Sequence, residues 1–247
     1  MAISPEFNLL VAVGFLAELV DGCFVMGYEI CSGVLLMGLG IPLVATRSSV
    51  LVAEVVVRGV SSVSHAWLGN VDRKIIRSLL LPGIVGGLTG AILLNRLPVS
   101  VLRPLVWAYL FVTSLVLLFR AIVRRAPIAS EPQGAQLGVI AGFLGGVGCG
   151  GWAAIMTSNM IARGVTPRYS VGAATTVSFC INLVCFGLWL PVGGIRYDLA
   201  IATMIGGILA APLAAWAARQ VAPRAAATAV GIIVCAVSVI GLFDTLT

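Results

Sequence analysis

The sequence predicts an all-α polytopic membrane protein, and three observations carry that prediction. Of the 247 residues, 60% are apolar and only 10% are charged, whereas a soluble domain has roughly a quarter charged residues. The mean hydropathy of +1.11 is too high for a globule that meets water on all sides. Apolar runs of about 20 residues, the length that crosses a bilayer, recur along the chain. These features exclude a secreted disulfide scaffold, a disordered chain and a cytosolic enzyme.

The apolar runs predict about eight transmembrane segments. Two runs, at about 7–39 and 135–162, are long for one straight span and are interrupted by glycine, so we expect broken, re-entrant helices there. The polar stretch from Arg120 to Gln136 divides the chain into a first membrane repeat (1–124), a connecting loop (125–134) and a second membrane repeat (135–247). The runs with the length of a single span lie at about 43–68, 75–95, 101–120, 168–191, 197–217 and 223–243.

The two halves resemble each other. Gly14-Phe15-Leu16 matches Gly142-Phe143-Leu144, and a glycine-containing break follows each, at Asp21-Gly22-Cys23 and at 145–151. Leu68-Gly69-Asn70-Val71-Asp72 is echoed by Gly193-Gly194-Ile195-Arg196-Tyr197-Asp198, again about 124–128 residues later. Internal duplication with a broken helix at corresponding positions is typical of secondary transporters.

The basic residues predict an orientation. The formal net charge is +6, but these residues are scattered singly at the ends of apolar runs, which fits the positive-inside rule rather than a nucleic-acid surface. If both long runs crossed the bilayer once, seven basic residues would fall on each side. If both turn back as hairpins, ten fall on one side and four on the other. We therefore expect inverted repeats with both termini on the outer face.

Neither a metal nor a cofactor is expected. The six cysteines lie inside apolar runs without C-x-x-C spacing, so they read as small buried hydrophobes. No P-loop lysine is present, and no G-x-G-x-x-G follows a predicted strand, so the sequence does not support a nucleotide site. The chain starts without Lys or Arg before its first apolar run, and we expect that run to stay as a membrane segment rather than to be cleaved.

A polar stripe marks the run 43–68. At 100° per residue, Arg47, Glu54, Arg58, Ser61 and His65 fall within about 60° of one another on a helical wheel. Such a stripe avoids lipid, where a charge costs several kcal/mol, and faces the protein interior or a water-filled path. Its acid and base are spaced i, i+4 and can pair. Two interpretations stay open: a pair that holds the bundle together, or the lining of an anion path with a titratable partner.

The second repeat carries Ser178 and Asn182 at the positions that match Glu54 and Arg58. This face is polar but uncharged. If the two helices meet at a pseudo-two-fold axis, one supplies charge and the other supplies hydrogen-bond donors. We expect this division to suit one small oxyanion.

Glycines at the breaks form a second candidate site. Half-helices that begin inside the membrane present free backbone N–H groups and a positive dipole end to an anion, and glycine lets the anion approach closely. The alternative is close helix packing through small residues. The glycines predicted to bind substrate are Gly22, Gly148, Gly150 and Gly151, with Gly27, Gly145 and Gly146 beside them.

Three acids in the first broken run, Glu18, Asp21 and Glu29, would repel a bare anion. Either burial keeps them protonated, or they carry coupling protons, or they bind a cation that travels with the substrate. Asp21 is the best of the three because it lies at the predicted break. Together with Glu54, we expect Asp21 and Glu18 to take part in proton coupling.

Motifs such as Val20-Asp21-Gly22, Gly69-Asn70-Val71-Asp72 and Gly142-Phe143-Leu144 resemble those of the TauE/SafE sulfite-exporter family of membrane permeases. The resemblance covers nearly the whole chain. It implies two similar membrane repeats and transport of sulfite, thiosulfate, sulfonates or related anions. The chain departs from the family pattern at Val177-Ser178-Phe179, where relatives repeat an Ala-Glu motif, and at Glu18 and Glu29. The motifs that carry it include Gly14-Phe15-Leu16, Val20-Asp21-Gly22, Ala53-Glu54-Val55, Gly69-Asn70-Val71-Asp72, Gly142-Phe143-Leu144, Gly150-Gly151-Trp152 and Pro167-Arg168-Tyr169-Ser170-Val171-Gly172.

The function predicted is that of a secondary transporter, and no enzymatic activity is expected. With the resemblance, it becomes a multi-pass permease of the bacterial inner membrane that moves a small sulfur-containing oxyanion with protons. Its expected partners are that anion, protons and the lipid bilayer, without nucleic acid, and a homodimer is left open. Two alternatives remain: a membrane-embedded enzyme acting on a lipid phosphate through the polar stripe, and a passive anion channel.

Overall fold

The computed structural model describes residues 5–25, 28–94, 108, 111–112, 114–115, 118–119, 134–146, 152–162, 165–189, 195–220 and 223–246. Within these ranges the chain is helical and forms no β-strand. The predicted all-α fold is therefore confirmed, while most of the predicted span at 101–120 and the connecting loop lie outside the described residues.

The first half of the chain contains α1 (Pro5–Phe24), α2 (Tyr28–Gly38), α3 (Leu43–Trp67) and α4 (Arg73–Leu94). Glycines with left-handed backbone end two of these helices: Gly40 has φ +80° after α2 and Gly69 has φ +70° after α3, a conformation that glycine adopts without steric cost. At the second end the Asn70 N–H donates to the carbonyl of His65 at 2.8 Å. This is a Schellman turn, which satisfies the last carbonyls of the helix.

The second half of the chain contains α6 (Gly134–Gly146), α7 (Trp152–Ala162), α8 (Pro167–Trp189), α9 (Tyr197–Ala217) and α10 (Pro223–Leu246). Proline is the first residue of α8 and of α10, a position where its missing N–H is not needed. Four helices are long and apolar enough to cross a membrane by length and composition: α3, α4, α8 and α9.

Each long apolar run contains two described helices, as predicted: α1 and α2 in the first run, α6 and α7 in the second. The first break was placed wrongly, however. Asp21 and Gly22 are helical residues of α1, and the backbone departs from the helix at Val25, which has φ +54°. A β-branched residue in this left-handed region is strained, so the break begins four residues beyond Asp21.

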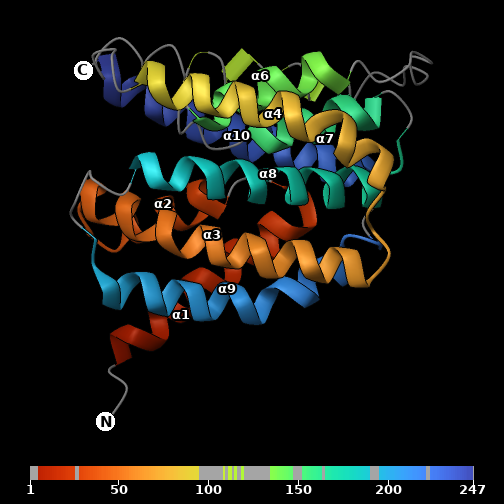
Figure 1. The fold of residues 1–247 in the computed structure, drawn as a ribbon. Helices are drawn as coiled ribbons and strands as arrows, with labels where there is room; N and C mark the ends of the chain where they lie inside the picture. The colour runs from red at the N-terminus through yellow and green to blue at the C-terminus, as the bar shows by residue number, and fades with distance from the viewer. Residues whose placement is uncertain are drawn as a thin grey trace.

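The helices form two packed groups, each with its own buried core. One core draws on α1, α2, α3 and α9, and includes Tyr28, Leu36 and Val57. The other draws mainly on α4, α6, α7 and α8, and includes Leu79, Met156 and Ile181. Figure 1 shows α8, α3 and α9 stacked beside one another, with α4, α6, α7 and α10 above them. Each group therefore contains one long helix from the other half of the chain: α9 in the first group and α4 in the second.

Equivalent helix crossings lie within the two groups, one in each. A methyl added at Gly206 of α9 would lie 2.0 Å from the Val11 carbonyl oxygen of α1, and one at Gly86 of α4 would lie 2.2 Å from that of Val139 in α6. Gly206 follows Gly86 by 120 residues, and Val139 follows Val11 by 128. Small residues allow such close backbone approach in membranes, and here the two crossings repeat each other.

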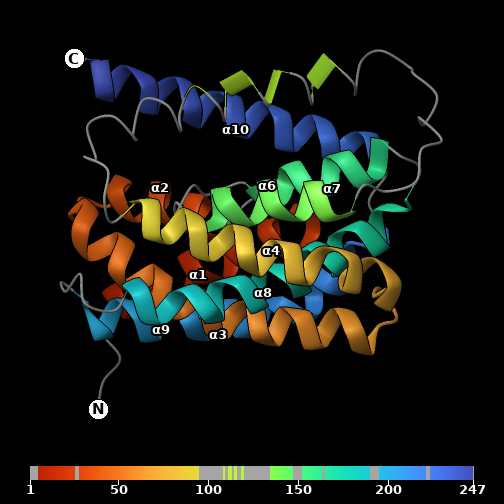
Figure 2. The same cartoon turned by 45° about the horizontal axis from the view of Figure 1, so that its top comes forward.

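Corresponding helices of the two halves run in opposite directions. In Figure 1 the chain passes from left to right along α3 and from right to left along α8, while α4 and α9 run right to left and left to right. Figure 2, turned by 45°, preserves these directions. The polar stripe of α3 and the matching face of α8 thus meet in an antiparallel arrangement.

Candidate functional site

Arg58 is the centre of a buried cluster of charged groups. Its side chain is only 2% exposed, although it lies on a helix long enough to span the bilayer. Its Nε lies 2.7 Å from Oε1 of Glu54, and its Nη2 lies 3.2 Å from Oδ2 of Asp21. A buried guanidinium of this kind is stable only where carboxylates compensate its charge.

The cluster follows from the local folding of two helices. Glu54 and Arg58 are four residues apart on α3, so the helix itself places them on one face. Asp21 comes from the last turn of α1, which packs in the same group of helices. The prediction that the acid and base of α3 pair is confirmed. The contact of Arg58 with Asp21, 37 residues away, could not be predicted from the spacing of the two residues in the sequence.

The second repeat contributes an amide to the cluster. Asn182 of α8 donates from Nδ2 to Oε1 of Glu54 at 3.2 Å, so the matching positions of the two halves touch. Ser178 is fully buried, but its hydroxyl donates to the carbonyl of Ala174 in its own helix at 2.6 Å. Asn182 therefore belongs to the cluster, whereas the hydroxyl of Ser178 is already used within α8.

Several buried polar atoms around Arg58 are left without a partner among the described residues. They are Nη1 of Arg58, Oγ of Ser61 and both carboxyl oxygens of Glu18. Ser61 faces the Glu18 carboxyl, but the pair lacks the geometry of a good hydrogen bond. Both side chains are at most 1% exposed. Unpartnered buried polar groups are costly, which marks this part of the cluster as a place for a polar ligand.

His65 lies one helical turn beyond Ser61 on the same face of α3 and is fully buried. Nδ2 of Asn70 is 3.3 Å from its Nδ1 and also donates to the carbonyl of Ala215 in α9 at 2.9 Å. Because an amide nitrogen can only donate, Nδ1 accepts and the neutral ring carries its proton on Nε2. The ring lies near the backbone of Gly22 at the end of α1, but its Nε2 has no hydrogen-bond partner among the described residues. Asn70 thus links His65 on α3 to α9.

The remaining predicted residues fall in different places. Gly22 lies inside α1, where an added methyl would meet the side chain of Ala214 at 2.5 Å, so this glycine serves helix packing. Gly148, Gly150 and Gly151 lie outside the described residues. Sequence reasoning missed Tyr28, which is fully buried and donates to the carbonyl of Thr203 at 2.8 Å. A lone tyrosine after a break gives no periodic signal.

In the part of the chain that the structure describes, no group of three His, Cys, Asp or Glu side chains is arranged to hold a metal. The carboxylates converge on Arg58 instead. Glu18, Asp21 and Glu54 would carry three negative charges against one positive charge if all were ionised. An uncompensated charge is expensive in a buried site, and this cluster holds more carboxyl groups than its one guanidinium can balance.

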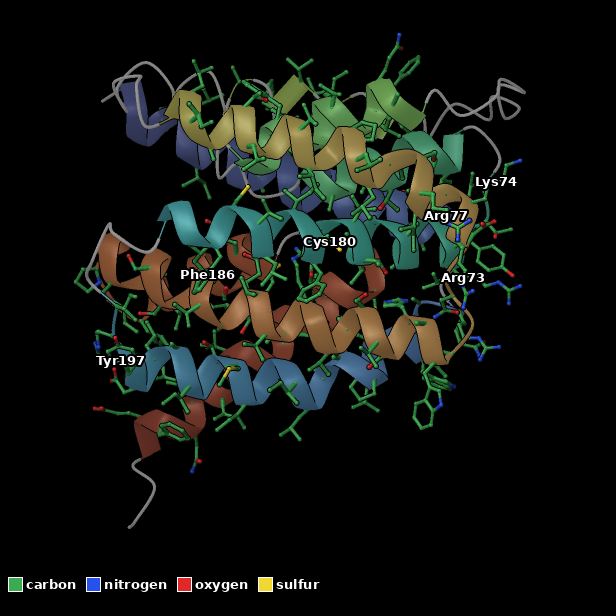
Figure 3. The ribbon with its side chains drawn as sticks, viewed as in Figure 1. Arg73, Lys74, Arg77, Cys180, Phe186 and Tyr197 are labelled. Atoms are coloured by element: carbon green, nitrogen blue, oxygen red, sulfur yellow. The ribbon has the colours of Figure 1, made fainter. Side chains whose placement is uncertain are left out.

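The two ends of the molecule differ in charge. Figure 3 shows Arg73, Lys74 and Arg77 together at the start of α4, with Tyr197 at the opposite end. Arg196, beside Tyr197, pairs with Asp198, and this hydrogen-bonded carboxylate raises the pKa of the Arg196 guanidinium above its ordinary value. One end thus gathers three basic side chains among the described residues, the pattern that the positive-inside rule associates with a cytoplasmic face.

The apolar spanning helices and the buried charge cluster define a polytopic helical membrane protein. The family model described as Sulfite exporter TauE/SafE matches residues 10–240. The chain is also 34% identical over 230 residues to a protein of Bacillus subtilis (strain 168) named "Probable membrane transporter protein YtnM". That match covers 89% of this chain and 77% of the relative. No solved structure matches the chain.

The chain therefore belongs to the TauE/SafE sulfite exporter family. The resemblance drawn from the sequence motifs is confirmed, and with it the class of membrane transporter. The matched range includes every described member of the buried cluster, from Glu18 on α1 to Asn182 on α8.

Proposed function

We propose that this protein is a proton-coupled secondary transporter that moves a small sulfur-containing oxyanion across the bacterial inner membrane as a multi-pass permease. Sulfite, thiosulfate and an organosulfonate are the candidate substrates, consistent with the family to which the chain belongs. The observation that carries the proposal is the buried guanidinium of Arg58, whose Nη1 has no partner among the described residues.

The chemistry of the cluster supports an oxyanion. A guanidinium presents planar, forked N–H donors that match the oxygens of an oxyanion. The hydroxyl of Ser61, three residues after Arg58 on the same helix face, supplies a further buried donor. Both groups lie where water is scarce, so each interaction with an anion gains strength from the low dielectric surroundings.

Proton coupling follows from the three carboxyl groups around Arg58. An anion that enters this cluster brings negative charge to a site where Glu18, Asp21 and Glu54 already outnumber the single cation. Charge balance then requires a proton to bind with each negative charge that arrives. A proton gradient would thereby drive the anion in the same direction.

The internal symmetry supports a transport cycle. Matching helices run in opposite directions, and the close crossing of α1 on α9 is repeated by α6 on α4. We propose that the halves are inverted repeats and that the cluster lies near their shared axis, where transporters of this kind place their substrate. Movement of one group of helices against the other would expose the cluster to each side in turn.

Reconstituted protein gives the test. Proteoliposomes that contain the purified protein are offered labelled sulfite, thiosulfate or a sulfonate, with and without an imposed pH gradient. We expect at least one anion to accumulate above its external concentration only when the gradient is present. Equilibration without accumulation would support a passive channel instead, and release of a lipid headgroup without transport would support an enzyme.

A further inference from the structure

The carboxylates of Glu54 and Asp21 contact Arg58 at different atoms and distances. Glu54 contacts Nε at 2.7 Å from the same helix, and Asn182 fixes its Oε1 from α8. Asp21 contacts Nη2 with both of its oxygens, at 3.2 and 3.3 Å, and comes from another helix. Charge-assisted hydrogen bonds are ordinarily 2.7–2.9 Å long. Asp21 is therefore the looser partner and the one more readily exchanged.

We propose that the Asp21 carboxylate occupies the place on Arg58 that the transported anion takes, and that a proton delivered to Asp21 releases the guanidinium to that anion. The proposal rests on the function proposed above and specifies how its site is coupled. A carboxylate and a small sulfur oxyanion offer the guanidinium the same feature, two oxygens on one negatively charged group. Asp21 thus acts as a placeholder when no substrate is bound.

The surroundings favour the exchange. Nη1 of Arg58 and the hydroxyl of Ser61 are unused while Asp21 is in place. An anion with three oxygens can reach donors that a two-oxygen carboxylate on a fixed backbone leaves idle. Asp21 also stands in the last turn of α1, four residues before the left-handed backbone of Val25.

Charge is conserved in the exchange. Before substrate arrives, Arg58 is paired with ionised Asp21. Afterwards one O–H bond has formed on Asp21, and the same guanidinium is paired with the anion. The cluster keeps its net charge, so one proton accompanies each monoanion. A dianion would need a second proton. Glu18 on α1 is the next carboxyl that could accept it, since its side chain is buried and its oxygens have no hydrogen-bond partner among the described residues.

Other charged and titratable groups face Asp21 from the helices packed around it. Those on α1 and α3 are Glu18, Glu54 and Arg58, which belong to the cluster. Thiols and a phenol also lie within electrostatic reach, from Cys23, Tyr28 and Cys31, but such groups ordinarily ionise well above neutral pH. The stretch of α9 from Thr203 to Ala214 has no titratable side chain. His65 also lies beside this group, against the backbone of Gly22. Proton exchange near neutral pH therefore involves the carboxyls and His65, and the Asp21→Asn variant isolates the proton taken up by Asp21.

Binding of sodium thiosulfate and sodium sulfite to the purified protein, measured by calorimetry in buffers of different ionisation enthalpy, counts the protons taken up with each anion. We expect wild type to take up one more proton per anion than Asp21→Asn. Because binding takes protons from solution, the affinity of wild type should fall about tenfold per pH unit for each proton taken up with the anion. For each unit by which the pH rises, the affinity of Asp21→Asn should fall tenfold less than that of wild type, because this variant takes up one proton fewer.

Asp198→Asn is the matched control, since it removes the same group from an exposed ion pair at the molecular surface, and it should behave as wild type. Equal proton uptake by wild type and folded Asp21→Asn would overturn the proposal, as would loss of binding in that folded variant. If Asp21→Asn does not fold, the wild type alone decides: anion binding without proton uptake in weakly buffered solution overturns the exchange. A wild type that neither binds nor transports any of the anions overturns the proposed function as well.

Discussion

At the scale of single residues, the cluster is asymmetric although the fold repeats. Glu54 and Arg58 correspond to Ser178 and Asn182, each 124 residues later. The amide at the position of the arginine reaches across to the carboxylate of the other repeat. The sequence comparison predicted that one half supplies charge and the other hydrogen-bond donors for an anion. In the structure these donors are directed at Glu54 and at the carbonyl of Ala174.

Replacing Glu54 by glutamine tests the role of this carboxylate. We expect Glu54→Gln to fold but to lose transport or its dependence on the pH gradient, because the amide can still hydrogen-bond yet cannot ionise against Arg58. Proteoliposome uptake across a range of pH values is the measurement, with the exposed Glu6→Gln as control. Unchanged uptake with an unchanged pH profile would leave Glu54 as a structural partner.

Asn70 is expected to matter for stability rather than for the substrate. Its amide joins the α3–α4 turn to His65 and to Ala215 of α9. Asn70→Ala leaves buried acceptors unpaired, which costs about 1–3 kcal/mol. Thermal unfolding should therefore begin at a lower temperature, while anion affinity of the folded fraction stays within twofold. A large loss of affinity at normal stability would place Asn70 in the binding site itself.

At the scale of helices, composition and periodicity predicted most of the architecture. The runs at about 43–68 and 197–217 became α3 (Leu43–Trp67) and α9 (Tyr197–Ala217), and both long runs proved to be broken. The exact break was not predictable from glycine alone, because Gly22 is needed for packing against Ala214 and the chain bends at Val25 instead. A glycine in a membrane helix can serve close helix packing instead of a turn, as Gly22 does here.

The helix crossings make a prediction about glycine. A methyl at Gly142 of α6 would lie 1.9 Å from the Gly83 carbonyl oxygen of α4, so Gly142→Ala must push the two helices apart. Gly187→Ala is the control, since nothing lies within 4 Å of the added methyl. We expect a clearly lower unfolding temperature for the first variant and an unchanged or slightly higher one for the second. Equal unfolding temperatures would mean that the crossing contributes nothing to stability.

At the scale of the whole molecule, the cluster could be predicted only in part. The pairing of Glu54 with Arg58 follows from i, i+4 spacing on one helix. The approach of Asp21 depends on how α1 packs against α3, and of Asn182 on how the two repeats face each other. Periodicity within one helix contains no information on either contact. Long-range contacts of this kind arise from tertiary packing.

Orientation is testable on the intact protein. The basic group at the start of α4, shown in Figure 3, and the charge count along the chain both predict that this end faces the cytoplasm and that the termini face outward. A C-terminal tag should be accessible to an impermeant reagent on intact spheroplasts. Access only after the membrane is opened would contradict this orientation and the hairpin interpretation of the two broken runs.

The central claim is that Arg58 binds the anion that the protein transports together with protons. One measurement tests this claim directly. Proteoliposomes with equal amounts of wild type or Arg58→Gln are loaded to the same internal pH, and accumulation of labelled sulfite or thiosulfate is followed as the external pH is lowered. We expect wild type to accumulate the anion in proportion to the imposed gradient and Arg58→Gln, folded and correctly inserted, to accumulate none. Accumulation by Arg58→Gln equal to that of wild type would contradict the account.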